Sequence, residues 1–184
     1  MQEIDNILRI LKETKKGINE GNAYKIKNLS DQTIHSATLY EDADNIVVAV
    51  LVYSISKIIE RESYRELSGW KEFYSSLIKN LDLAILSLEQ SNIEKFRKAE
   101  QNIRISISKI DGKLRDYIED IFRKARINKA SKIYEHGLSL TSTSELLGTD
   151  LWELAAYVGQ SSTGENSESE EVKKRIKFAE ELFK

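Results

Sequence analysis

The 184-residue sequence contains no proline and no cysteine. An average composition would include about nine prolines. Because proline interrupts helix interiors and punctuates loops, its absence predicts long helices joined by short connections. Without cysteine the chain forms no disulfide, no thiolate metal site and no cysteine nucleophile.

Long apolar runs are also missing. The longest, residues 46–53, is far shorter than the roughly 20 residues that cross a bilayer. The N-terminus carries Glu3 and Asp5 before any basic residue, so no secretory signal is predicted. We therefore expect a cytoplasmic protein with no membrane partner. Its net charge of −2 does not by itself indicate nucleic-acid binding.

Apolar residues recur at helical spacing along most of the chain and predict an all-α fold, with a helical bundle over residues 1–122. The first helix is expected to be ended by Lys16–Gly17 and Glu20–Gly21–Asn22, and the second to begin near Asn22, unless Ser30–Asp31 caps a fresh start. A third helix is expected over residues 46–64, although its β-branched residues favour a strand on propensity. A fourth is predicted over residues 70–89.

Between residues 96 and 121, apolar residues alternate three- and four-residue steps, the a/d pattern of a coiled-coil seam. The seam consists of Phe96, Ala99, Ile103, Ile107, Ile110, Leu114, Tyr117 and Ile121. It predicts one long helix, paired either with a neighbouring helix or with a second copy in a homodimer. Gly112 lies inside it, where a kink or a close approach is expected. No clean internal repeat is found.

Residues 123–159 predict a helix-turn-helix-like unit. A helix is expected to end at Gly137, a short helix to cover residues 140–147, and Thr149 or Asp150 to cap a third helix after Gly148. Residues 131–159, the last part of this unit, have the sequence SKIYEHGLSLTSTSELLGTDLWELAAYVG. Residues 126–159 resemble the helix-turn-helix part of small VapBC-type antitoxins, on the basis of Ala130, Tyr134, Gly137, Ser139, Leu140, Glu145–Gly148, Trp152, Glu153 and Leu154.

The resemblance implies a protein partner. Antitoxins of this type accompany PIN-domain ribonuclease toxins and neutralise them with a C-terminal segment. The helical region in front of residue 123 has no counterpart in that family.

DNA binding is an alternative function, and the distribution of basic and acidic residues bears on it. A basic face is predicted on the helix before the turn, formed by Arg123, Lys124, Arg126, Lys129 and Lys132. Such a face suits phosphate contacts. However, no Lys or Arg lies between Ile133 and Val172, where eight acids do, and acids repel the DNA backbone. A helix-turn-helix used for protein packing is therefore preferred.

The tail is predicted to be a flexible linker over residues 160–171, followed by an amphipathic helix over residues 172–184. We expect that helix to dock into a groove of this chain, of a second copy or of a foreign partner. The residues predicted to bind the partner are Val172, Lys174, Arg175, Ile176, Ala179, Leu182 and Phe183.

Catalytic motifs are missing from the sequence. Neither histidine, His35 nor His136, has a second histidine at metal-ligand spacing, and His136 is expected at a helix C-terminus. Glu41, Asp42 and Asp44 could hold a cation weakly, but a helix cap explains them better. We expect no cofactor and no enzymatic activity. The hypotheses are an antitoxin-like regulatory protein, a DNA-binding regulator or a self-associating structural protein.

Overall fold

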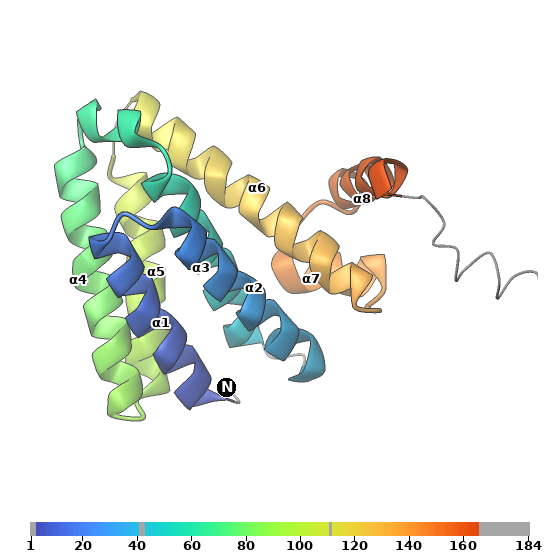
Figure 1. Ribbon diagram of the computed structural model, residues 1–184, viewed down its shortest axis with the longest axis horizontal. Helices are drawn as coiled ribbons and strands as arrows, with labels where there is room; N and C mark the ends of the chain where they lie inside the picture. Colours follow the sequence, from blue (N-terminus) through green and yellow to red (C-terminus); the bar gives the residue numbers. More distant parts are fainter. Residues whose placement is uncertain (1–2, 41–42, 111, 166–184) are drawn as a thin grey trace, which may run out of the picture.

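The computed structural model describes residues 3–40, 43–110 and 112–165. Over these ranges the fold is all-α, which confirms the predicted fold class (Figure 1). Its helices are α1 (Ile4–Asn19), α2 (Ala23–Tyr40), α3 (Ala43–Ile59), a 3-10 helix η1 (Glu62–Glu66), α4 (Trp70–Glu89), α5 (Ile93–Ser108), α6 (Lys113–Glu135), α7 (Leu140–Leu147) and α8 (Leu151–Glu165). None of the helices in this part of the chain is both long and apolar enough to cross a membrane.

Local signals place several helix ends correctly. Helices α4 and α7 cover the residues predicted for them. The side chain of Ser139 accepts a hydrogen bond of 3.1 Å from the backbone N–H of Ser142 at the start of α7. Asp150, rather than Thr149, caps α8, because its Oδ1 accepts a 2.9 Å hydrogen bond from the N–H of Glu153.

Two expected helix ends differ from the structure. Helix α1 ends at Asn19, at the Glu20–Asn22 signal, so Gly17 lies inside it; a Cβ there would come within 2.7 Å of Cγ1 of Ile26, so this glycine lets α1 and α2 approach closely. Helix α2 begins at Ala23, as expected, and the alternative start at Ser30–Asp31 does not occur. The third helix ends at Ile59 instead of residue 64, and η1 follows it.

The predicted continuous helix over residues 96–121 is also wrong. Helix α5 ends at Ser108 and α6 begins at Lys113, with Gly112 at φ 72° and ψ −153°, a conformation that glycine adopts readily. The break changes which face of α6 is inside. Ile118 is fully buried, whereas the predicted seam residue Tyr117 is 45% exposed.

The first six helices form an internal repeat that the sequence analysis missed. The last residues of α1 and α4 are 19 and 89, the first of α2 and α5 are 23 and 93, and the first of α3 and α6 are 43 and 113, a constant offset of 70. The turns match in detail. Asn22 caps α2, because its side chain accepts a 2.9 Å hydrogen bond from the backbone N–H of Lys25. Asn92 caps α5 in the same way, with a 3.0 Å hydrogen bond from the backbone N–H of Lys95. The fold is thus two three-helix units followed by α7 and α8.

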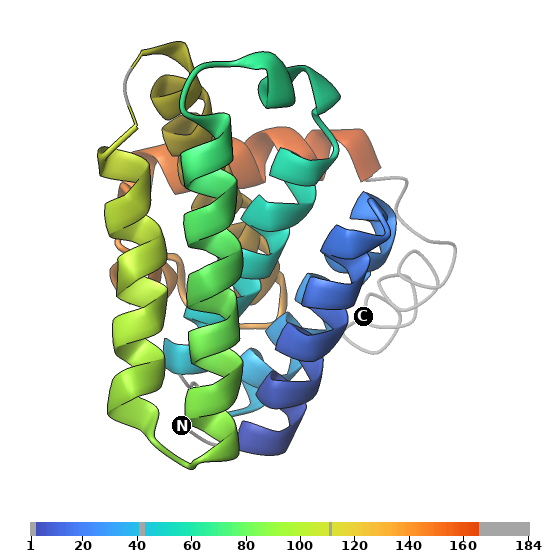
Figure 2. The same ribbon diagram turned by 90° about the vertical axis from the view of Figure 1, so that its left-hand side faces the viewer.

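The two units pack differently. Helices α1 and α4 lie side by side, with α5 antiparallel to α4 (Figure 2). Helix α3 packs along α2 in the first unit, but α6 touches α5 only over a few residues and packs on α3 instead. Figure 1 shows α6 running diagonally away from the α4–α5 hairpin to α7 and α8. In the second unit α5 and α6 therefore diverge, and we call this unit splayed.

Helices α7 and α8 complete a second, smaller core. It contains Ile34, Ile46, Ala49, Val50, Ala125, Ala130, Ile133, Leu147 and Leu154, and so includes residues of α2 and α3. The predicted division between residues 122 and 123 falls inside α6, which continues across it without a break. Helix α8 extends to Glu165, so the predicted flexible linker over residues 160–171 is wrong in its first half, and the rest of it lies outside the described residues.

Candidate partner-binding site

The predicted basic face of α6 is broken by the burial of Lys129. This side chain has no exposed surface, and its Nζ donates a 2.8 Å hydrogen bond to Oδ1 of Asp31 in α2. Its Nζ also lies 4.3 Å from the centre of the Tyr53 ring, a cation–π contact. The prediction that Lys129 contacts phosphate is therefore wrong for this conformation, because no surface of the side chain reaches solvent.

Lys132 joins the same carboxylate, donating to Oδ1 of Asp31 at 2.6 Å. Burial lowers the pKa of Lys129 to about 8, while Asp31 acts in the opposite direction. Burial alone would raise the pKa of Asp31, but the hydrogen bonds from both lysines outweigh it and hold that pKa below its usual value. The two lysines thus fasten α6 to α2.

The other three basic side chains are engaged at the surface. Arg123 binds Asp120 at 2.8 Å and also forms an ion pair with Glu153 of α8. Lys124 binds Asp120 at 2.7 Å. Arg126 donates a hydrogen bond of 3.3 Å to the carbonyl oxygen of Gly148. Four of the five residues thus connect α6 to α2, to α8 or to the turn after α7, whereas Lys124 pairs only within α6.

Large apolar side chains are exposed to solvent at the end of α7 and the start of α8. Trp152 is 80% exposed, Leu151 39% and Leu146 36%. We call these three residues the α7–α8 patch, since they flank the turn between those helices. Exposed tryptophan is uncommon, and clustered apolar side chains of this kind mark interaction surfaces. The surroundings of the patch are acidic, with Glu145 and Asp150 both exposed.

The sequence analysis missed this patch, because it considered Trp152 only as part of the helix-turn-helix resemblance. One signal could have revealed it. Within α8, Leu154 is buried and Val158, four residues later, packs against the same core, and Trp152 is off that stripe.

The remaining predicted sites fall in different places. Asp44 binds Arg97 of α5 through two hydrogen bonds of 2.9 and 2.8 Å, so it is not a free cation ligand. No group of three or more potential metal ligands occurs in the described parts of the chain. His136 is the C-cap of α6, as predicted. The side chain of His35 lies outside the described residues, as do Glu41 and Asp42 and the whole predicted partner-binding set from Val172 to Phe183.

Comparison with known protein families, with curated proteins and with solved structures finds no match to this chain.

Proposed function

We propose that this protein is a non-enzymatic binding protein that docks a protein partner on the α7–α8 patch. The observation that carries the proposal is the 80% exposure of Trp152 beside two partly exposed leucines. A tryptophan buried at the centre of an interface contributes more than most residues, because it removes a large apolar area from water and keeps one N–H donor.

Charge defines the kind of partner. No Lys or Arg lies between Ile133 and Val172, and Glu145 and Asp150 are near the patch. A partner segment with an apolar face and a basic rim is complementary to this surface, since it pairs with the acids while covering Trp152. A phosphate backbone is not complementary to it.

This proposal keeps the regulatory role expected from the sequence but moves its support from the tail to α8. A PIN-type toxin as the partner, and neutralisation of it by residues 172–184, stay predictions from resemblance. The DNA-binding alternative receives no support from the basic side chains, because Lys129 is buried and the others are held by acids or a carbonyl.

Co-purification from the native cell, followed by affinity measurement with the isolated partner, tests the proposal. Trp152→Ala should weaken the partner's Kd at least tenfold. Tyr24→Ala is a matched control, because Tyr24 is an aromatic residue on α2 with 74% exposure. It should leave the Kd unchanged. Equal affinity of wild type and Trp152→Ala would overturn the proposal.

Two further measurements separate the alternatives. Light scattering on the purified chain detects self-association, and a dimer abolished by Trp152→Ala would identify a second copy as the protein partner. Duplex DNA binding that falls steeply with salt and is lost in Arg123→Gln would instead favour the DNA-binding regulator.

A further inference from the structure

The splayed second unit leaves a groove of about 850 Å³ between α3, α5, α6 and α7. This volume is within the range of small-molecule sites, roughly 300–1,000 Å³. The first unit has no room for such a groove, since α2 and α3 are in close contact there. The groove therefore arises where the two repeats differ.

One pair of equivalent positions shows the difference clearly. In the first unit Ser30 is buried, and its hydroxyl donates a 2.7 Å hydrogen bond to the carbonyl oxygen of Ala49, which ties α2 to α3. Seventy residues later the position is Glu100, which lines the groove and is only 7% exposed. Its Oε1 has no hydrogen-bond partner among the described residues. A buried polar atom left unpaired costs stability, so a bound group that pairs with it is favoured.

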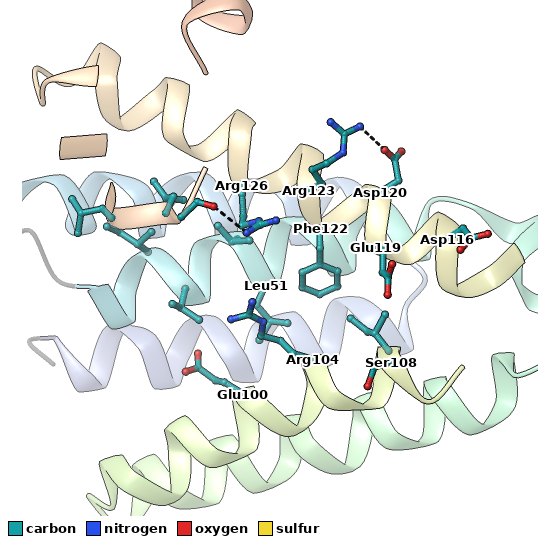
Figure 3. Close-up of a pocket in the computed structure, with 17 residues that line it drawn as sticks. Leu51, Glu100, Arg104, Ser108, Asp116, Glu119, Asp120, Phe122, Arg123 and Arg126 are labelled. Carbon is teal, nitrogen blue, oxygen red and sulfur yellow. Dashed lines mark hydrogen bonds and ion pairs between the residues drawn. The ribbon is translucent and has the colours of Figure 1, made fainter. Parts of the chain in front are cut away.

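The wall of the groove beside Glu100 is apolar. It is made by Ile46, Val50, Leu51, Ile107, Phe122 and Leu147. Figure 3 shows Leu51 and the Phe122 ring in the middle of this wall. An alkyl or aromatic body placed here would exchange water for apolar contacts.

Two arginines project over the same wall. Figure 3 shows Arg104 of α5 and Arg126 of α6 on either side of the groove, near Leu51. Arg104 forms no ion pair or hydrogen bond with any residue that the structure describes, and Arg126 has only the 3.3 Å contact to the Gly148 carbonyl. Within the described parts of the chain neither guanidinium is bound to a carboxylate, although each presents several N–H donors suited to one.

Apart from Glu100, whose pKa burial raises to about 8 so that it is uncharged at neutral pH, the acids of the groove are elsewhere or already paired. Glu119 binds Arg115 at 2.8 Å, and Asp120 binds Arg123 and Lys124. Asp116 is at the far end of the groove in Figure 3. With Glu100 protonated, the described residues leave the positive charge of Arg104 and Arg126 uncompensated at this end of the groove.

We propose that this groove binds an amphipathic small molecule with an apolar body and one anionic head group, a carboxylate or a phosphate. Arg104 and Arg126 hold the head group from two sides, while the body lies on Leu51 and Phe122. Glu100 supplies a hydrogen bond beside the body or the head. The groove shares Leu146 with the α7–α8 patch, but the proposal requires no protein partner.

Isothermal titration of the full chain with three ten-carbon probes, each below its micellar concentration, tests this inference. Decanoate and decyl phosphate carry the two candidate head groups, and decanol carries none. At least one anion should bind, with decanol at least tenfold weaker, because charge-assisted hydrogen bonds to the arginines are lost. The tighter of the two anions identifies the head group.

Matched variants locate the site. Arg104→Gln and Arg126→Gln should each weaken the anion about tenfold and leave decanol unchanged. Arg65→Gln removes an exposed arginine from η1, outside the groove, and should change nothing. Thermal melting of each variant confirms that it is folded. The inference is overturned if neither anion binds, if decanol binds equally well, or if the Arg65 variant weakens the anion as much as the other two.

Discussion

Lys129 of α6 and Asp31 of α2 are joined in the protein interior by a 2.8 Å hydrogen bond, although 98 residues separate them in the sequence. The ammonium group has no access to water, and the carboxylate is one-third exposed. Such a pair contributes little net stability compared with apolar residues, but breaking it leaves a buried charge without compensation. The bond therefore couples the first unit to the helix that carries α7 and α8.

Removing the carboxylate should destabilise the protein strongly. Asp31→Asn should cost about 3 kcal/mol, at the low end for a broken buried pair because Asp31 is partly solvated. Lys129→Met should cost less, since it removes the buried charge and keeps the packed stem. Urea unfolding monitored by circular dichroism measures both. Lys132→Met, which alters the partly exposed partner of the same carboxylate, should cost about 1 kcal/mol or less. A loss with Asp31→Asn no larger than with Lys132→Met would contradict the finding.

Glu100 should make stability fall as pH rises from about 4.5 to about 8. Burial and the nearby Asp44 raise the pKa of Glu100 to about 8, against the favourable effect of Arg97. The folded state then binds a proton that the unfolded state has released, so the contribution is fully present below pH 4.5 and is lost by about pH 8. Glu100→Gln should leave stability nearly unchanged at pH 5 and raise it at pH 8 by on the order of 3 kcal/mol. Equal effects at both pH values would show that Glu100 is ionised in the folded protein.

Lys129 should affect folding stability at a higher pH than Glu100 does. Burial lowers its pKa to about 8 from the usual 10.5. Between these values the unfolded state binds more protons, so this residue's contribution to stability is largest above pH 10.5 and is lost as pH falls through 8. The free energy of unfolding of wild type should therefore rise relative to that of Lys129→Met as the pH is raised from 7.5 to 10. A difference that does not change with pH would mean that the ammonium is solvated.

Local sequence signals explain what could be predicted and what could not. The signals that define α4 and α7 are encoded within a few residues, and both helices were predicted correctly. The Asn92 cap marks the start of α5 in the same local way, but the end of that helix was predicted wrongly. The burial of Lys129 depends on Asp31, which is far away in the sequence, so a charge pattern on α6 alone suggests a solvated face. The repeat was missed because it preserves burial and turn geometry while the residue types change, as at Ser30 and Glu100. The groove follows from the splay of α6, which no local pattern encodes.

The exposure of Trp152 can be measured by fluorescence. The chain has two tryptophans, and Trp70 is 8% exposed while Trp152 is 80% exposed. In Trp70→Phe the emission should be red-shifted and strongly quenched by acrylamide, as expected for an indole in water. In Trp152→Phe the remaining emission should be blue-shifted and weakly quenched. If both variants are quenched equally, α8 does not present Trp152 to solvent, and the α7–α8 patch loses its main residue.

The repeat supplies a paired test of backbone conformation. The turn between α1 and α2 contains Gly21 at φ 65°, and the equivalent position between α4 and α5 is Ser91 at φ 53°. Both lie in the left-handed region, which costs a non-glycine residue about 1 kcal/mol.

Opposite substitutions at these two positions should therefore have opposite signs. Ser91→Gly should stabilise the protein by about 0.5–1 kcal/mol, because relief of strain exceeds the added freedom of the unfolded chain. Gly21→Ser should destabilise it by about 1 kcal/mol. A Cβ at Gly21 meets no atom within 4 Å, so a steric clash does not contribute to this change. Since the turns belong to separate units, the double variant should show additive changes in urea unfolding. Destabilisation by Ser91→Gly would mean that the hydroxyl, and not the backbone conformation, determines stability at this turn.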